Sequence, residues 1–200
     1  MLVHLQSSNF SNDYLKYLDQ DPVHSFSDDR SVNRRCQKDR NIFFWVEDAV
    51  VTAVLCVAYA LGLKDNINDI LSEKSPIEDS ADHAIFYSVF RTDEPTKVKN
   101  TGAVLIREAA AWIKNNKSEI GHFVTMSPIP NLSAHFKEPP DIRVIAEFLR
   151  EQKDPVARFH IRNGASLLRV IPDADISDRR KSQSFCIMVN YDYTPNIISQ

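Results

Sequence analysis

Two apolar runs separated by an acidic pair constrain the fold of this chain most strongly. The run "AVVTAVLCVAYALGL" covers residues 49–63, is rich in β-branched residues and is too short to span a bilayer. The run "IFFWV" precedes it, and Glu47 and Asp48 stand between the two. This pattern predicts a hairpin of two well-buried strands. Such a hairpin needs further strands and helices to cover its apolar faces.

The other patterned segments predict a mixture of strands and helices. Strands are expected at 83–91, 122–130, 165–171 and 184–193. Helices are expected at 7–20, 65–74, 101–117 and 139–153, and residues 25–41 are expected to form a helix or a loop. The basic run at 179–181 is interpreted as a solvated turn. The predicted fold class is therefore α/β (α+β), with one mixed, mostly antiparallel sheet flanked by helices.

Composition narrows the class of protein. With 200 residues and 43% hydrophobic side chains, the chain suits a single globular domain over 1–200. A formal net charge of −3 and dispersed basic residues argue against nucleic acid or an anionic membrane as the main partner. Three widely spaced cysteines fit a reducing cytoplasm, and no signal peptide is expected at the start.

Three residues are candidates for chemistry, and each has a plainer explanation. Gly102 opens the helix predicted at 101–117, where amide groups could bind a pyrophosphate, although a simple loop turn would also use glycine. Ser127 stands before a Pro-x-Pro break, where it could instead serve the turn. His160 lies between Phe159 and Ile161 and could be a core histidine. No metal site is predicted, because HxxxH and HxH spacings are missing among the other histidines: His4, His24, His83, His122 and His135.

Several motifs in one order resemble the catalytic domain of malonyl-CoA decarboxylases. They are "HAIFYSV", "GAVLIREA", "FVTMSPIPNL", "DPVARFHIRNGASLLRV" and "MVNYDY". The family typically shows AIFYS, SPIPGF, NPVANFH followed by NGA, and a closing NYRY. The resemblance covers roughly residues 5 to 195 and implies a GNAT-like acyl-CoA N-acyltransferase fold, with a coenzyme A thioester as substrate and no prosthetic group.

The resemblance also implies roles for individual residues. The proposed catalytic pair of the family matches Ser127 and His160, and a supporting tyrosine matches Tyr193. The strand that pairs its backbone with the pantetheine arm matches Ser88 and Val89. The pyrophosphate-binding loop matches the segment "NTGAV", which comprises Asn100, Thr101, Gly102, Ala103 and Val104.

The implied reaction converts malonyl-CoA to acetyl-CoA and CO2. It leaves a thioester enolate, so a site must hold the carboxylate, stabilise the oxyanion and protonate the carbon. Serine can orient the carboxylate, a histidine that titrates near neutrality can deliver the proton, and Tyr193 can assist.

The chain also departs from the family. We expect the family's preceding helical domain to be absent. The chain has Asn131 in place of a glycine, and a shortened segment 131–154 that would leave the pocket more open. An acyltransferase acting on an amine or hydroxylamine, as in siderophore-like pathways, is the alternative function, and a CoA-binding module without turnover is a third. The protein is expected to be a monomer or a homodimer.

Overall fold

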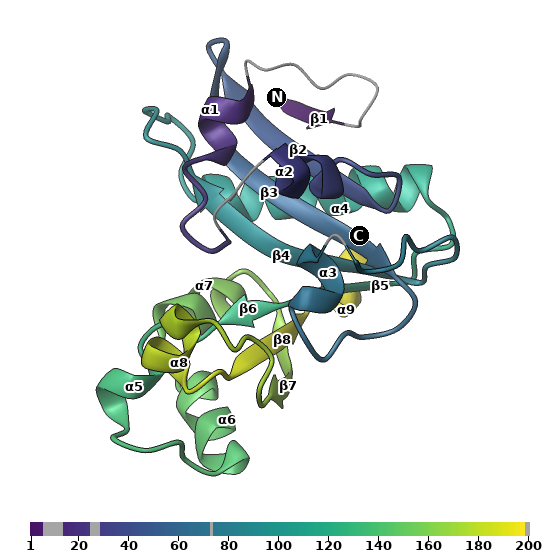
Figure 1. Cartoon of the computed structure of the whole chain (residues 1–200). Helices are drawn as coiled ribbons and strands as arrows, with labels where there is room; N and C mark the ends of the chain where they lie inside the picture. Colours follow the sequence, from purple (N-terminus) through teal and green to yellow (C-terminus); the bar gives the residue numbers. More distant parts are fainter. Residues whose placement is uncertain (6–13, 25–28, 73, 199–200) are drawn as a thin grey trace. The chain divides into compact units, whose positions relative to one another are not determined.

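A computed structural model of the chain describes residues 1–5, 14–24, 29–72 and 74–198 (Figure 1). The contacts divide the chain into two compact units. Unit 1 comprises Met1–Leu63 and Ile70–Gly121, and unit 2 comprises Lys64–Asp69 and His122–Gln200. Parts of three predicted segments, residues 7–13, 25–28 and 73, lie outside the described residues.

Unit 1 is built on antiparallel strands that pair in sequence order. These strands are β1 (Leu2–Leu5), β2 (Arg40–Glu47), β3 (Val50–Ala60) and β4 (His83–Arg91). The helices of this part of the chain are α1 (Leu15–Leu18), α2 (Asp29–Arg35), α3 (Asn68–Leu71), which crosses the boundary between the units in the sequence, and α4 (Thr101–Asn116).

The predicted hairpin is confirmed as β2 and β3. Its turn pairs Glu47 with Val50, and both central residues have positive φ, 48° at Asp48 and 67° at Ala49. A two-residue turn with two positive φ angles matches the right-handed twist of the strands that it joins. All residues of β3 after Val50 are buried, as the continuous apolar run predicts.

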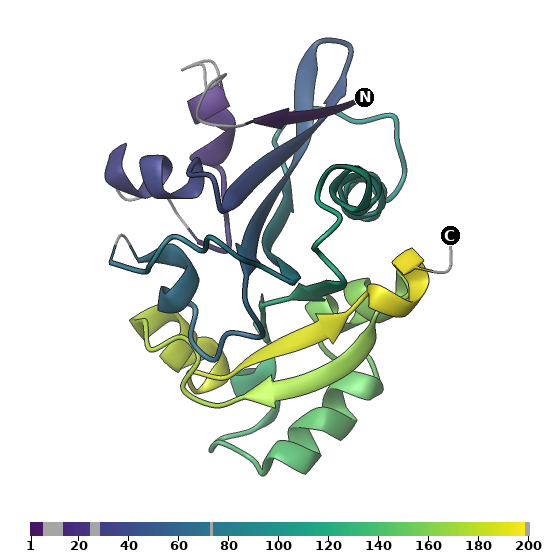
Figure 2. The same ribbon diagram turned by 90° about the vertical axis from the view of Figure 1, so that its right-hand side faces the viewer.

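Helix α4 covers this sheet and confirms the helix predicted at 101–117. It packs mainly on β3 and also on β2, and Figure 2 shows it nearly end-on beside the strands of unit 1. Its buried side chains recur at helical spacing and include Leu105, Ala109 and Ile113. Strand β4 contains one extra residue, Tyr87, because Cys56 pairs with Ser88 whereas Val57 pairs with Phe86.

Unit 2 is organised around β8 (Met188–Asp192). This strand pairs antiparallel with β5 (His122–Thr125), β6 (Ser127–Pro128) and β7 (Ser166–Ile171), and Figure 2 shows β7 and β8 side by side. The helices of unit 2 are α5 (Leu132–His135), α6 (Ile142–Arg150), α7 (Pro155–Arg162), α8 (Asp178–Ser184) and α9 (Thr194–Ile198).

One interpretation of the sequence is wrong. Residues 179–181 belong to helix α8, and Arg180 is buried instead of solvated. Ser177 caps this helix, and the Arg180 guanidinium donates to Gln183 and lies 3.6 Å from an Asp175 carboxylate oxygen. A run of three basic residues hides this outcome, because only one of them faces the interior.

The predicted fold class is confirmed: within each unit the paired strands run antiparallel, and helices flank them. Within the described parts of the chain, every helix falls short of the length and apolar character needed to cross a membrane.

Candidate active site

Three predicted residues form one hydrogen-bonded row in unit 2. The Ser127 Oγ atom lies 3.1 Å from His160 Nε2, and the Tyr193 hydroxyl lies 2.9 Å from His160 Nδ1. Ser127 is on β6, His160 is on α7 and Tyr193 directly follows β8. All three side chains are buried. The structure therefore brings together residues that are 33 positions apart on each side of His160.

Helix α7 holds His160 in place through its N-terminus. Asp154 caps this helix by accepting hydrogen bonds from the amides of Val156 and Ala157, and Pro155 occupies the first turn. The second Asp154 carboxylate oxygen accepts from the Asn131 amide, which ties the loop after "SPIP" to the helix. Burial raises the pKa of Asp154, and these amide hydrogen bonds lower it in part. One buried carboxylate thus connects two segments of the site.

Burial decides the charge of His160. Its side chain is 3% exposed, and desolvation lowers its pKa to about 3. The imidazole is therefore neutral at physiological pH, so the expectation that it titrates near neutrality is wrong. Burial likewise raises the pKa of Tyr193, whose hydroxyl keeps its proton. The row consists of neutral donors and acceptors.

Two further residues contact the row, and the sequence motifs did not identify either of them as a site residue. The Thr125 Oγ1 atom accepts a hydrogen bond from Ser127 at 2.9 Å, and the Tyr191 ring stacks on His160 at 4.8 Å between centroids. The twofold alternation of a strand places Thr125 on the same face as Ser127, and Tyr191 on the same face as Tyr193. This alternation was the signal that could have identified both.

Side chains replace backbone hydrogen bonds between β5 and β8 at Thr125. The register stays constant, since Val124 pairs with Asp192 and Ser127 pairs with Val189. Between these pairs, the Tyr191 amide donates to Thr125 Oγ1 at 3.0 Å and the Asn190 side chain donates to the Thr125 carbonyl. The ladder is therefore completed by polar side chains next to His160.

The residues predicted to contact the pantetheine arm lie in unit 1. The Ser88 side chain is buried and donates to Asp21 at 2.9 Å, so this hydroxyl is engaged within the protein. Val89 is half-buried beside it and pairs with Leu55 of β3. Only the backbone of this stretch of β4 suits the predicted role.

The predicted pyrophosphate loop leads into α4 through a left-handed residue. Asn100 has φ 56° and ψ 41°, and its side chain makes no capping hydrogen bond. Its carbonyl accepts from the amides of Ala103 and Val104, whereas Thr101 and Gly102 are buried in the first turn. The positive end of the α4 dipole lies here, and no acidic residue occupies the first turn. Two lysines that the sequence motifs do not include, Lys97 and Lys99, are exposed just before this turn, and Lys97 pairs with Asp48.

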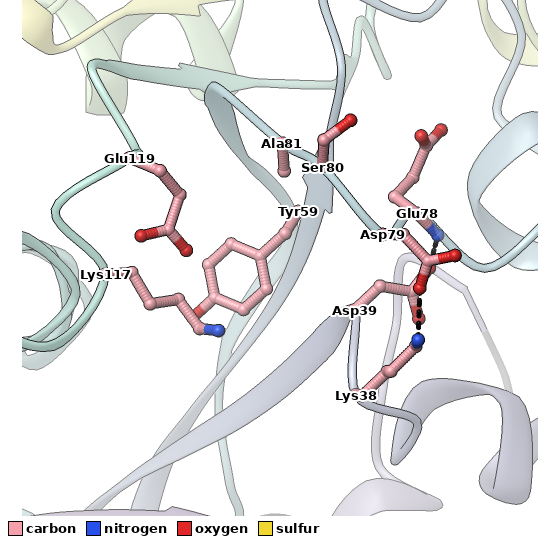
Figure 3. Close-up of a pocket in the computed structure, with 9 residues that line it drawn as sticks. All are labelled: Lys38, Asp39, Tyr59, Glu78, Asp79, Ser80, Ala81, Lys117 and Glu119. Carbon is pink, nitrogen blue, oxygen red and sulfur yellow. Dashed lines mark hydrogen bonds and ion pairs between the residues drawn. The ribbon is translucent and has the colours of Figure 1, made fainter.

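A pocket of about 470 Å³ in unit 1 contains none of the predicted residues. Figure 3 shows Lys117 and Glu119 on one side of it and Lys38, Asp39 and Asp79 on the other. Four of its charged side chains have partners: Lys38 pairs with Asp79, Asp39 pairs with Arg34 and Arg40, and the Lys117 ammonium lies over the Tyr59 ring. We assign no function to this pocket. Among the described residues, no group of three or more His, Cys, Asp or Glu side chains could hold a metal ion.

Comparison with known proteins gives consistent relatives. The family model "Malonyl-CoA decarboxylase C-terminal domain" matches residues 12–146 and 143–200. The mitochondrial malonyl-CoA decarboxylase of Rattus norvegicus is 24% identical over 252 residues, which cover 88% of this chain and 51% of that protein. This chain thus spans about half the length of that relative.

Solved structures show the fold. A malonyl-CoA decarboxylase from Rhodopseudomonas palustris matches with a TM-score of 0.81 and 23% identity, over 100% of this chain and 61% of that chain. The GphF GNAT-like decarboxylase, in complex with isobutyryl-CoA, matches with a TM-score of 0.69 and 14% identity, over 96% of this chain and 97% of that chain. The predicted GNAT-like fold is confirmed.

Proposed function

The chain belongs to the malonyl-CoA decarboxylase C-terminal domain family, and from this premise we propose that it decarboxylates malonyl-CoA to acetyl-CoA and CO2. The observation that carries the proposal is the buried row of Tyr193, His160 and Ser127. The family model covers residues of both units, which supports treating residues 1–200 as one catalytic domain.

We assign the row two tasks in this reaction. When malonyl-CoA binds, the Ser127 hydroxyl turns from Thr125 to the malonyl carboxylate and helps to hold it out of the thioester plane. The bond between the carboxylate carbon and C2 then breaks, CO2 leaves, and the electron pair remains on C2 as a thioester enolate. The enolate is stabilised by preorganised donors and must receive one proton at C2.

The low pKa of His160 determines how that proton arrives. A neutral imidazole cannot supply it as an imidazolium, but it can relay it. Ser127 protonates C2, His160 Nε2 returns a proton to Ser127, and the Tyr193 hydroxyl returns one to Nδ1. Solvent then reprotonates Tyr193 and the imidazole proton returns from Nδ1 to Nε2, so the row is restored and the net reaction consumes one proton. A thioester enolate is much more basic than a phenolate, so the relay runs downhill.

We propose that coenzyme A is bound through the backbone of β4 at Ser88 and Val89 and through the start of α4. The left-handed Asn100, the helix dipole and the exposed Lys99 support binding of the pyrophosphate there. The side chain of Ser88 is not part of this assignment, because it already bonds to Asp21.

A turnover assay with variants tests the proposed function. Purified protein comprising residues 1–200 is incubated with malonyl-CoA in D2O, and the products are followed by mass spectrometry. We expect acetyl-CoA with one deuterium on the acetyl carbon. Replacing Ser127→Ala or Tyr193→Phe is expected to slow the reaction on the order of a hundred- to a thousand-fold. The matched control is Ser182→Ala, which removes an exposed hydroxyl from α8 in the same unit.

A second arm includes a pool of amines and hydroxylamines. Acetylated acceptor would assign the protein to acyl transfer instead, the alternative derived from the shortened segment 131–154. Intact malonyl-CoA in every sample would refute decarboxylation.

Cys36, Cys56 and Cys186 are free thiols, which supports a reducing compartment such as the cytoplasm. We propose a monomer or a homodimer.

A further inference from the structure

We infer that Thr125 is a positioning residue that fixes the direction of the hydrogen bonds along the row and thereby selects the tautomer of His160. Thr125 makes no contact with the proposed substrate in this scheme and acts through Ser127. The inference rests on the proposed function only where it concerns turnover, because the tautomer can be measured in the protein alone.

The two hydrogen bonds that Thr125 Oγ1 accepts carry the inference. One comes from the Ser127 hydroxyl at 2.9 Å and the other from the Tyr191 amide at 3.0 Å. A hydroxyl oxygen has two acceptor positions, so both are filled. Thr125 is fully buried, so water does not compete for them. In the protein without substrate, its oxygen therefore takes the only proton that Ser127 can donate.

The direction of the other bonds follows from this one. Since Ser127 donates to Thr125, it must act as the acceptor toward His160, and Nε2 must carry the imidazole proton. A neutral imidazole has one protonated nitrogen, so Nδ1 accepts from the Tyr193 hydroxyl. Every proton then points along the row from Tyr193 toward Ser127, which is the direction that protonation of C2 requires.

The opposite direction becomes available once the Thr125 oxygen is removed. The Ser127 hydroxyl can then donate to His160 Nε2, the ring takes its proton on Nδ1, and Tyr193 becomes the acceptor. The row would keep its three residues and its distances, but the protons would point away from Ser127. A residue without any contact to the reacting atoms can thus control the relay.

Neighbouring side chains hold Thr125 in this position. The Asn190 side-chain nitrogen Nδ2 donates to the Thr125 backbone carbonyl, and the Asn190 side-chain oxygen Oδ1 accepts from Arg169 Nε at 2.7 Å. Arg169 also donates to the Lys64 carbonyl and pairs with Asp65 at 2.7 Å. These contacts fix the orientation of the Asn190 amide, which in turn fixes the strand segment that presents Thr125.

Nitrogen NMR of histidine measures the predicted tautomer directly. The protein is labelled with ¹⁵N-histidine, and the His160 signals are assigned by their loss in His160→Gln. In the wild type we expect the protonated-nitrogen signal at Nε2 and the unprotonated signal at Nδ1. In Thr125→Val, which keeps the side-chain shape but has no acceptor, we expect the two signals to exchange nitrogens. Thr125→Ser, which restores the oxygen, should return the wild-type pattern.

Kinetics supply the second readout. Thr125→Val should lower kcat on the order of a hundredfold with a much smaller change in KM, and Thr125→Ser should restore most of the rate. In a Ser127→Ala background, Thr125→Val should cause no further loss, because Thr125 acts through Ser127. Ser184→Ala is the matched control, since it removes a fully buried hydroxyl of unit 2 that donates to the backbone carbonyls of Arg180 and Ile187.

Each outcome decides the inference. A wild-type protein with the proton on Nδ1 overturns it without any variant, and so does Thr125→Val with the proton still on Nε2. If Thr125→Val does not fold, Thr125→Cys, with a weakly accepting sulfur, takes its place in both readouts. Absence of malonyl-CoA turnover in every sample would refute the proposed function, whereas the NMR spectra would still decide the role of Thr125.

Discussion

The neutral charge of buried His160 makes the stability of the protein depend on pH in a specific window. The pKa of this ring is about 3 in the folded protein, compared with the ordinary value of 6.5. As pH falls below 6.5, the unfolded chain binds a proton at this ring while the folded protein does not. Stability is therefore lost from pH 6.5 down to about pH 3. The full effect is about 5 kcal/mol, at 1.36 kcal/mol per pKa unit.

Measurements of the unfolding free energy at pH 7 and pH 5 are enough to test this pH dependence. Between pH 7 and pH 5, one and a half units below the unfolded pKa, His160 should cost the wild type about 2 kcal/mol of unfolding free energy. His160→Gln lacks the titrating ring. Its deficit relative to the wild type should therefore be about 2 kcal/mol smaller at pH 5 than at pH 7, as measured by urea denaturation at both values. Comparison with the wild type cancels the other titrating groups.

The control for this test is His122→Gln, which removes an exposed histidine of the same unit. A deficit for His160→Gln that stays the same at both pH values would refute the reasoning, because it would mean that the folded and unfolded rings bind protons alike. A deficit that grows at pH 5 would show that the folded protein binds the proton more tightly, which would contradict a relay through a neutral ring.

Three further substitutions have defined outcomes. Ala49→Gly should raise the unfolding free energy by about 1 kcal/mol, because Ala49 has φ 67° in the hairpin turn; an unchanged urea midpoint would contradict this. Asp154→Ala should cost about 2 kcal/mol of unfolding free energy, clearly more than Asp141→Ala, which removes an exposed cap that accepts a hydrogen bond from the Arg143 amide. The same denaturation assay compares the two. Lys99→Ala should raise KM for malonyl-CoA several-fold with little change in kcat, and the effect should shrink as salt is added; a loss confined to kcat would remove Lys99 from the proposed CoA site.

Local patterns in the sequence predict much of this fold. The hairpin of β2 and β3 and the helix α4 follow from a continuous β-branched run and from apolar residues at helical spacing, signals that each depend on neighbouring residues. Helix α8 was missed because its buried Arg180 depends on Asp175 and Gln183 for partners, and a basic run alone does not indicate which residue will find them.

The candidate site shows where sequence reasoning stops. The resemblance to a family picks out Ser127, His160 and Tyr193, and the structure places them within hydrogen-bond distance of one another. The charge of His160 could not be predicted, because it depends on desolvation by residues that surround it only after folding. The contribution of Thr125 was equally hidden, since it depends on two hydrogen bonds whose donors come from different strands.

The constant register between β5 and β8 has a consequence for how the site can vary over time. At Thr125 the two strands are joined by a hydroxyl and an amide side chain, and such bonds can break by rotation of a side chain without unpairing the strands. The Tyr191 amide should therefore exchange its hydrogen with solvent through smaller openings than the nearby Tyr193 amide, which donates to the Phe123 carbonyl. The hydrogen bonds around the His160 imidazole can therefore open locally while β5 and β8 stay paired.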